Sequence, residues 1–388
     1  MPRTTRSSLS VLVLPLLLAL SCAESLAHDA SAWGGLFRSR DAGATWSSVN
    51  PASFVSGALA VAVSPVDPHH LLLGTDTGLS RSRNGGRDWV LEAQAALAGP
   101  VFAVAFDVDG ERALAAGASG LFRADGDRWR PLQAPAAMVS SIVATAQRGR
   151  AYVAGAAGLY RTDDWGESWV PGDAGLANGR ATVVVVDRNR PEVVGAVAAG
   201  RFWTSADAGG TWQARDDALS GYQVEAVALD PAEPDRVWSV AAGRVFRSDD
   251  HGRHWQTVGV PLPDQPLVSH AVAVVDRVLV VATDRGVYRG ADSGAQWSLV
   301  GDNLPAHLDA GLLAHEPQSP ATIYAGFALT PRHELLRRAA EGRGALSRLD
   351  VVSIGGGLAF MALLLIAGGV VVKRLARTHY RVPGSVPR

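Results

Sequence analysis

Cysteine and lysine are scarce in this chain, and its net charge is close to zero. Its 388 residues include 1 cysteine, Cys22, and a single lysine, Lys373, and the formal net charge is −1. One cysteine excludes a disulfide scaffold. The balanced charge argues against nucleic acid as a partner, because phosphate binding needs a basic excess. Composition also excludes disorder, since 47% of the residues are hydrophobic, which is enough to bury a large core.

The first 27 residues have the pattern of a secretory signal peptide. Arg3 and Arg6 precede an apolar run at 9–20, and Ser25-Leu26-Ala27 forms a small-x-small cleavage site. The apolar run is short for a retained membrane anchor. Cleavage after Ala27 leaves a mature chain without cysteine, and lipidation of Cys22 is the alternative that stays open.

A long uncharged run at 351–372 predicts one C-terminal transmembrane helix. Lys373 and Arg374 follow it directly, as expected for a cytoplasmic flank. We therefore predict a single-pass protein of the cytoplasmic (inner) membrane. Its body is extracytoplasmic, 331–350 is a juxtamembrane linker, and 373–388 is a basic cytoplasmic tail.

Tryptophan is abundant by contrast: the 11 Trp outnumber the 9 Phe and 6 Tyr. Seven of them end a repeated octet and follow one another at intervals of 40 to 43 residues. The clearest copy is Ser39-Arg40-Asp41-Ala42-Gly43-Ala44-Thr45-Trp46, and the third copy, at 124–129, is shortened. The terminal tryptophans are Trp46, Trp89, Trp129, Trp169, Trp212, Trp255 and Trp297. The acidic or amide position holds Asp41, Asn84, Asp125, Asp164, Asp207, Asp250 and Asp292.

This octet resembles the Asp-box, or bacterial neuraminidase repeat, of β-propellers. The resemblance covers roughly 28–328 and implies one propeller blade per repeat. The residue types suit a tight corner, because an Asp carboxylate can accept backbone N–H groups and Gly can adopt positive φ. Each Trp offers a large packing surface with one N–H to satisfy. The resemblance implies structural roles for the seven acidic or amide residues and the seven tryptophans.

Each repeat also carries three further strand patterns, which makes four strands, the content of one blade. The first octet lacks the two inner strands before it, and the last octet is followed by an inner pair without an octet. We therefore predict an all-β fold: a seven-bladed propeller over 28–330, closed by pairing N-terminal outer strands with C-terminal inner strands. Closure removes exposed edges.

The sequence offers no identifiable catalytic or metal set. His251 and His254 fall inside one octet, and His69-His70 fall inside a turn, so we expect no metal and no cofactor. Sialidases with this repeat use an arginine triad, a Tyr nucleophile and acidic partners, and the expected arginine motif is missing. Only Tyr222 is placed to reach the ligand face. A sialidase-like glycoside hydrolase acting on glycans therefore remains the alternative, and we expect no enzyme activity.

Arginines in turns opposite the octets are the candidate partner-binding residues. Arg201, Arg244 and Arg285 occupy one turn position in three successive repeats, and Arg180 enters an inner strand beside them. Guanidinium groups suit carboxylates of a protein or peptide. A second set, Arg38, Arg81, Arg123, Arg161, Arg247 and Arg289, repeats once per blade and predicts hydrogen bonds between blades.

The chain is most similar to the photosystem II stability and assembly factor-like propellers, which share its turns and its Gly-led third strand. That resemblance implies protein binding and help in assembling a membrane complex. Sortilin-type receptors, which are more distant, also join an Asp-box propeller to one membrane span. The sequence does not predict an oligomeric state.

Overall fold

The computed structural model describes residues 34–49, 57–92, 97–135, 138–215, 219–305 and 308–341. The chain divides into two compact units, Met1–Leu336 and Arg337–Arg388. The predicted signal peptide at 1–27, the membrane span at 351–372 and the tail at 373–388 lie outside the described residues. Among the described residues, no helix has the length and apolar character needed to cross a membrane.

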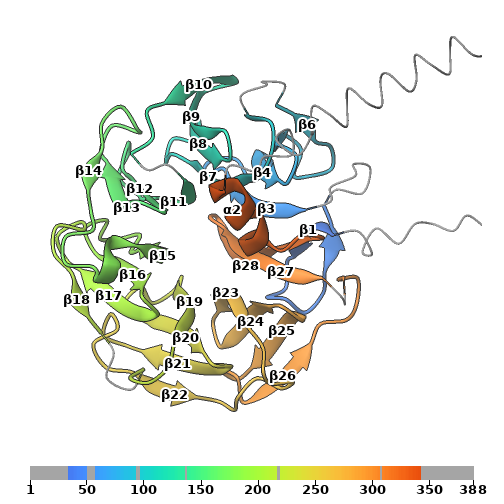
Figure 1. Cartoon of the computed structure of the whole chain (residues 1–388). Coiled ribbons are helices and arrows are strands. Elements are labelled where there is room, and N and C mark those ends of the chain that lie inside the picture. Colours follow the sequence, from blue (N-terminus) through green and yellow to red (C-terminus); the bar gives the residue numbers. More distant parts are fainter. Residues whose placement is uncertain are drawn as a thin grey trace, which may run out of the picture. The chain divides into compact units, whose positions relative to one another are not determined.

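Seven four-stranded antiparallel sheets form the first unit and are arranged around a common centre (Figure 1). Blades 1 to 3 comprise β3 (Ala58–Val63), β4 (Leu71–Thr75), β5 (Leu79–Ser82), β6 (Val90–Leu91); β7 (Val101–Phe106), β8 (Arg112–Gly117), β9 (Gly120–Asp125), β10 (Arg128–Leu132); β11 (Val139–Ala144), β12 (Ala151–Gly155), β13 (Gly158–Thr162) and β14 (Val170–Pro171). Blades 4 to 6 comprise β15 (Ala181–Val186), β16 (Val194–Ala198), β17 (Arg201–Ser205), β18 (Gln213–Ala214); β19 (Val224–Leu229), β20 (Val237–Ala241), β21 (Arg244–Ser248), β22 (Gln256–Val258); β23 (Ser269–Val275), β24 (Val278–Thr283), β25 (Gly286–Ala291) and β26 (Gln296–Leu299). Blade 7 comprises β27 (Asp309–Glu316), β28 (Ser319–Ala328), β1 (Gly35–Ser39) and β2 (Ser47–Ser48). The predicted seven-bladed propeller is confirmed.

Blade 7 closes the ring by joining the two ends of the propeller. Strand β1 pairs with β28 in antiparallel register, with Phe37 opposite Ala325, and the order of the sheet is β2-β1-β28-β27. Phe37 and Phe327 meet edge to face at 5.5 Å, inside a core cluster shared with blade 6. The predicted closure is therefore confirmed, and it pairs strands that otherwise have exposed edges.

Burial follows the position of a strand within its blade. Strand β7 has the sequence VFAVAF and is buried along its whole length, because neighbouring blades cover both of its faces. Outermost strands are short and more exposed, as in Val90 and Leu91, which are 71% and 59% exposed. The core is therefore a ring of apolar clusters between adjacent blades.

The octets form the corners between third and fourth strands, and five of them share one hydrogen-bond pattern. In blade 4, Ser205 Oγ accepts the backbone N–H of Gly209 at 2.9 Å, and Asp207 Oδ1 accepts that of Thr211 at 2.8 Å. The equivalent acidic or amide residue accepts the N–H four residues onward in the other four blades: Asp41, Asn84, Asp164 and Asp250.

The expectation that all seven octets share one role needs correction for Asp125 and Asp292. The shortened third octet is a hairpin in which β9 runs through Asp125, whose carboxylate pairs with Arg123 at 2.9 Å. The last octet has Gly290 where the five regular octets have Ser or Thr, so no hydroxyl supports the corner. There Asp292 points outward to Arg277, and both side chains are largely exposed.

The terminal tryptophans and one arginine position hold neighbouring blades together. Trp212 Nε1 donates to the Gly172 carbonyl of the preceding blade at 2.8 Å, and Trp89 and Trp297 make equivalent bonds. Arg161 donates to the Ala208 carbonyl in the next octet at 2.8 Å. Backbone carbonyls of the next octet also accept hydrogen bonds from Arg38, Arg81 and Arg289, and Arg123 donates instead to the Glu167 carboxylate of the next octet. The predicted bonds between blades are confirmed at these five arginines, and Arg247 instead pairs with Asp249.

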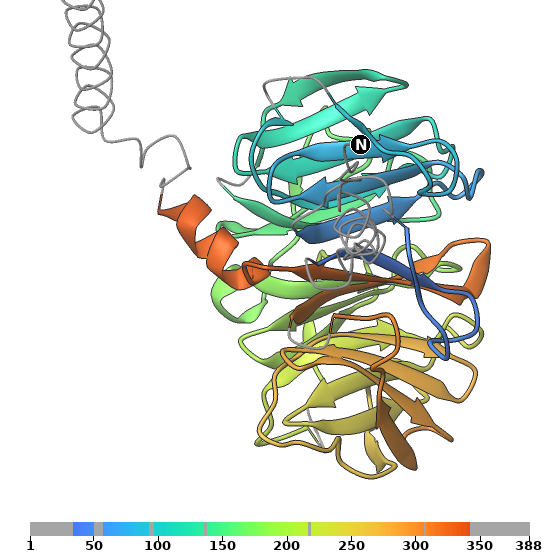
Figure 2. The ribbon, with the colours of Figure 1, turned by 90° about the vertical axis from the view of Figure 1, so that its right-hand side faces the viewer.

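The ring has two edges, because alternate turns of an antiparallel meander lie at opposite ends of its strands. The octets and the turns joining first to second strands share one edge, which we call the octet edge. Turns joining second to third strands, and connections between blades, share the other. The helix α2 (Arg332–Ala340) follows β28 at this second edge, and Figure 2 shows it on one side of the ring. Residues 331–336, predicted as part of the linker, belong to the ring unit.

Candidate functional site

The predicted partner-binding arginines lie on the edge opposite the octets. Arg201 and Arg244 begin β17 and β21, Arg285 lies in the turn between β24 and β25, and Arg180 precedes β15. All four are exposed. Within the described ranges, the side chains of Arg180 and Arg244 have no hydrogen-bond or ion-pair partner, whereas Arg285 donates to the Pro266 carbonyl at 3.1 Å.

These arginines follow the rim of the ring across blades 4 to 6, and none of them lines a cavity at the ring centre. Tyr222 is half-buried and packs on Phe246, with ring centroids 5.2 Å apart. The structure therefore places Tyr222 in the packing between β19 and β21, and leaves the arginines as a dispersed basic rim.

A different set of residues converges at the ring centre on the same edge. All seven innermost strands carry a β-bulge at their second or third residue, so one residue in each blade has no partner on the neighbouring strand. The bulges of all seven blades lie at the edge opposite the octets, which we therefore call the bulge edge. The bulged residues are Leu59, Phe102, Ser140, Thr182, Glu225, His270 and Gly311. A bulge disrupts the local ladder, which leaves backbone groups available for other partners.

Arg332, the first residue of α2, uses two of these freed carbonyl groups. Its Nη2 donates to the Phe102 carbonyl at 3.1 Å and to the Ser140 carbonyl. No carboxylate among the described residues pairs with this guanidinium. Burial without a counter-charge lowers the pKa of Arg332 below its usual value.

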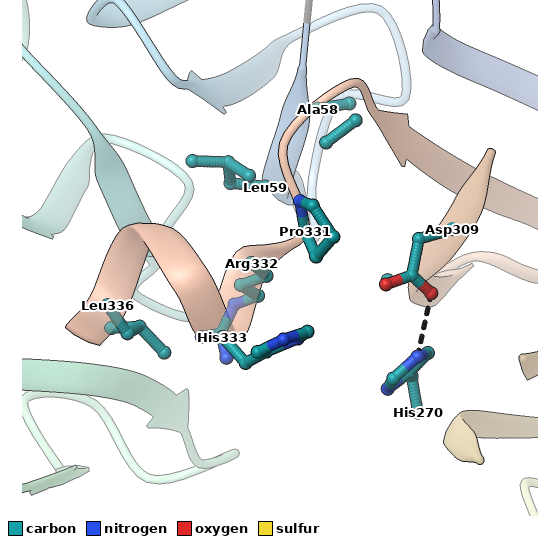
Figure 3. Close-up of a pocket in the computed structure, with 10 residues that line it drawn as sticks. Ala58, Leu59, His270, Asp309, Pro331, Arg332, His333 and Leu336 are labelled. Atoms are coloured by element: carbon teal, nitrogen blue, oxygen red, sulfur yellow. Dashed lines mark ion pairs between the residues drawn. The ribbon is translucent and has the colours of Figure 1, made fainter. Parts of the chain in front are cut away.

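His270 and Asp309 form a second polar pair beside Arg332. His270 Nε2 lies 2.7 Å from Asp309 Oδ1, yet the two atoms are not aligned for a hydrogen bond, and neither has another partner among the described residues. Figure 3 shows this pair on one side of a cavity of about 130 Å³, with Arg332 and His333 on the other. Buried polar atoms without a protein partner are uncommon, which sets this pair apart from the other polar groups of the ring.

The central channel continues inward from this pair. A second cavity of about 310 Å³ is lined by segments of β3, β7, β11, β23 and β27, together with Arg332. Apolar residues such as Phe102 and Leu313 line it, but its exposed surface is more polar than apolar, and Arg332 and His270 are its titratable groups.

One cluster of metal-ligand type occurs among the described residues, at Asp187, Asp235 and His251. The Arg190 guanidinium contacts all three, at 2.7 Å from Asp187 Oδ2 and 2.6 Å from His251 Nε2, and with a short hydrogen bond to Asp235. A guanidinium in this position supplies the positive charge that a metal would otherwise bring. The cluster is therefore an ion-pair link between blades 4 and 5.

Sequence reasoning missed the bulge ring and Arg332. A bulge shifts the pairing by one residue, which a strand pattern of apolar residues does not reveal. Arg332 lies in a segment rich in arginine that was predicted to be a linker. The one sequence signal was Pro331 directly before a short charged segment, since Pro favours the first turn of a helix.

No protein-family model matches the chain, and no curated protein sequence matches it. Solved structures do resemble it. YCF48 bound to D1 peptide is 18% identical and covers 71% of this chain and 94% of its own, with a TM-score of 0.54. YCF48 from Cyanidioschyzon merolae is 15% identical and covers 70% of this chain and 95% of its own, with a TM-score of 0.55.

A GH74 xyloglucanase from Xanthomonas campestris is similar as well. It is 18% identical, with a TM-score of 0.56, and the match covers 70% of this chain and 51% of the xyloglucanase. The chain thus spans about half the length of that enzyme. Because the sequence identities to these structures are below 20%, the structural similarity establishes only the β-propeller fold. Binding proteins and enzymes share that fold.

Proposed function

We propose that this chain is a membrane-tethered, extracytoplasmic Asp-box propeller without enzyme activity. It binds an acidic segment of a protein or peptide partner on its bulge edge. We further propose that the partner belongs to a membrane complex whose assembly or stability the propeller supports. One similar fold, YCF48, has been solved with D1 peptide bound, which supports peptide binding by a ring of this kind.

The observation that carries this proposal is the run of exposed arginines along the bulge edge of blades 4 to 6. The octet carboxylates are engaged in their own corners or in ion pairs with nearby arginines. On the bulge edge, Arg180 and Arg244 are exposed and have no acidic partner in the described part of the chain. Exposed guanidinium groups favour carboxylate ligands and can bind them through two parallel hydrogen bonds.

The predicted tether keeps the ring near the membrane. The chain leaves the ring unit at Leu336, and the predicted membrane span begins at Val351. A fully extended chain between them covers at most about 50 Å. We therefore propose that the partner segment is an extracytoplasmic loop of a membrane protein, which lies within reach of the ring.

Glycoside hydrolysis is the second candidate, and the likeness to a xyloglucanase favours it. That chemistry needs two carboxyl groups about 5 to 10 Å apart around one bond. The central cavities present Asp309 on the bulge edge and Asp187 on the octet edge, and His270 and Arg190 lie against them. This distribution supports binding over hydrolysis.

The test is affinity capture of the partner from native membranes. We would compare the full-length protein with a variant carrying Arg180→Ala, Arg201→Ala, Arg244→Ala and Arg285→Ala. The expected result is loss of the captured membrane protein, because the basic rim is gone. Arg87→Ala and Arg253→Ala, two exposed octet-edge arginines, form the matched control and should leave capture unchanged.

Two results would contradict the proposal. Equal recovery of partner by the four-arginine variant and the wild type would exclude the rim as the binding surface. Turnover of fluorogenic sialosides or xyloglucan oligosaccharides by the wild-type protein would replace the binding proposal with the hydrolase.

A further inference from the structure

The chain covers the centre of its own bulge edge with residues 331–336, which comprise Pro331 and the start of α2 and belong to the ring unit. We propose that this segment is a plug, and that a partner segment reaches the ring centre only when the plug is displaced. The effect on partner binding rests on the proposed function, whereas the plug depends only on contacts within the ring unit.

The plug lies against the bulged residues of five blades. Arg332 donates to the carbonyls of Phe102 and Ser140, the bulged residues of blades 2 and 3. Three more bulged residues, from blades 1, 6 and 7, line the cavity of about 130 Å³ together with Arg332 (Figure 3): Leu59, His270 and Gly311. Because these contacts come from five of the seven blades, the plug lies over the ring centre (Figure 1).

The other two bulged residues lie outside this cover. Thr182 and Glu225 belong to blades 4 and 5, and neither lines a cavity that Arg332 lines. The same two blades carry Arg201 and Arg244 of the basic rim. A partner that is bound along this rim therefore meets the plug when it extends toward the ring centre.

The plug is held loosely. Helix α2 has 9 residues, none of which is buried, and isolated helices of this length are marginal in water. Beneath the plug, His270 Nε2 and Asp309 Oδ1 have no aligned hydrogen-bond partner, so the plug covers this polar pair without satisfying it. Segments with few buried contacts open at a lower free energy than the core. Displacement of the plug therefore does not require unfolding of the ring.

Arg332 fastens the plug to the ring. Its two hydrogen bonds use carbonyl groups at bulges, where the ladder between strands is disrupted. Gly311 leaves room for Arg332, because a Cβ added at Gly311 would already lie 3.9 Å from Arg332 Cβ. Removal of the guanidinium, or a large side chain at position 311, should therefore displace the plug.

Thiol accessibility in the full-length protein tests the plug. Cys22→Ser removes the natural cysteine, so an introduced cysteine is the only thiol. Leu59→Cys places this thiol beneath the plug, at a position that is 3% exposed. We expect added Arg332→Ala to accelerate maleimide labelling there by at least about 10-fold, because the segment then opens more often. Arg332→Lys should have a smaller effect.

Two further thiols are the controls. Thr182→Cys, at the exposed bulged residue of blade 4, should be labelled equally fast with and without Arg332→Ala. Ser239→Cys, fully buried in β20, should stay unlabelled and shows that the ring remains folded. If Arg332→Ala unfolds the ring, Gly311→Leu takes its place and should give the same acceleration. Equal labelling of Leu59→Cys with and without the displacing change overturns the plug.

Affinity capture from native membranes tests the effect on partner binding. A site that is open for only a fraction of the time binds with a correspondingly lower apparent affinity, so Arg332→Ala should recover at least about threefold more partner than the wild type. Equal recovery despite faster labelling overturns this effect and leaves binding at the rim intact. Absence of a partner with both proteins contradicts the proposed function and this effect with it, whereas the labelling result decides the plug by itself.

Discussion

The two edges of the ring use the same residue types in different ways. On the octet edge, Asp and Arg meet at short range, as in the pairs Arg150–Asp163 at 2.6 Å and Arg236–Asp249 at 2.7 Å. On the bulge edge, Arg180, Arg244 and Arg332 have no carboxylate partner within the described ranges. Charged residues that repeat once per blade therefore have structural roles. Arginines without a carboxylate partner lie outside those repeated positions or on the exposed surface.

The largest expected effect is on the octet edge, at a buried tryptophan. Trp212→Ala removes a side chain that is 8% exposed and a hydrogen bond to the preceding blade. We expect a loss of about 3–5 kcal/mol in the free energy of unfolding, because of the cavity it leaves. Urea unfolding monitored by fluorescence measures this loss. Trp297→Ala, at the more exposed last octet, is the control and should cost clearly less.

Removal of one link between blades should have the next largest effect. Arg161→Gln breaks the bond to the Ala208 carbonyl, and we expect a loss of about 1.5–3 kcal/mol, typical of hydrogen bonds to a charged group. Arg277→Gln breaks only the pair with Asp292, in which both side chains are more than 70% exposed, and should cost less than about 1 kcal/mol. An equal loss of unfolding free energy in the two variants would contradict the claim that hydrogen bonds between blades stabilise the ring more than exposed ion pairs do.

Acid should weaken the octet corners selectively. Burial raises the pKa of Asp41, but hydrogen bonds from Thr45 and Ser39 outweigh it and lower the pKa to about 2. Because the folded-state pKa lies below the ordinary value, the stabilisation is present above about pH 4 and is lost as the pH falls toward 2. Asp41→Asn should therefore lose less stability than the wild type between pH 5 and pH 2. Asp292→Asn, which caps no corner, should follow the wild type in the same urea titrations.

The smallest expected effect is on the bulge edge. Arg180→Ala and Arg244→Ala remove exposed side chains without partners in the described part of the chain, so each should change stability by less than about 0.5 kcal/mol. Differential scanning calorimetry measures this. A larger loss would mean that the rim arginines stabilise the fold, and would weaken their assignment to partner binding.

The part of the fold that could be predicted from the sequence was the part that repeats. Seven tryptophans at near-constant spacing indicated seven blades, and the unpaired inner strands after the last octet indicated closure through β1 and β28. Deviations within the repeat were harder to predict. Asp125 and Asp292 keep the residue type but lose the corner geometry, because one octet is shorter and the other lacks the supporting hydroxyl.

The candidate site was predicted only in part, for a physical reason. Arg180, Arg201, Arg244 and Arg285 were placed on the correct edge because the alternation of turns follows from the order of strands. Their dispersal along the rim, and the position of Arg332 over the channel, depend on how seven blades pack around one centre. His270 and Asp309 meet across blades 6 and 7, and no local pattern in either segment indicates that contact.

Photo-cross-linking in living cells tests the difference between the edges most directly. A photoreactive amino acid would replace Ser220, which is exposed on the bulge edge between blades 4 and 5, or Ala206, which is exposed within the octet of blade 4. The account predicts a cross-linked membrane protein from position 220 and none from position 206. Cross-links from position 206 alone, or equal cross-links from both positions, would contradict it.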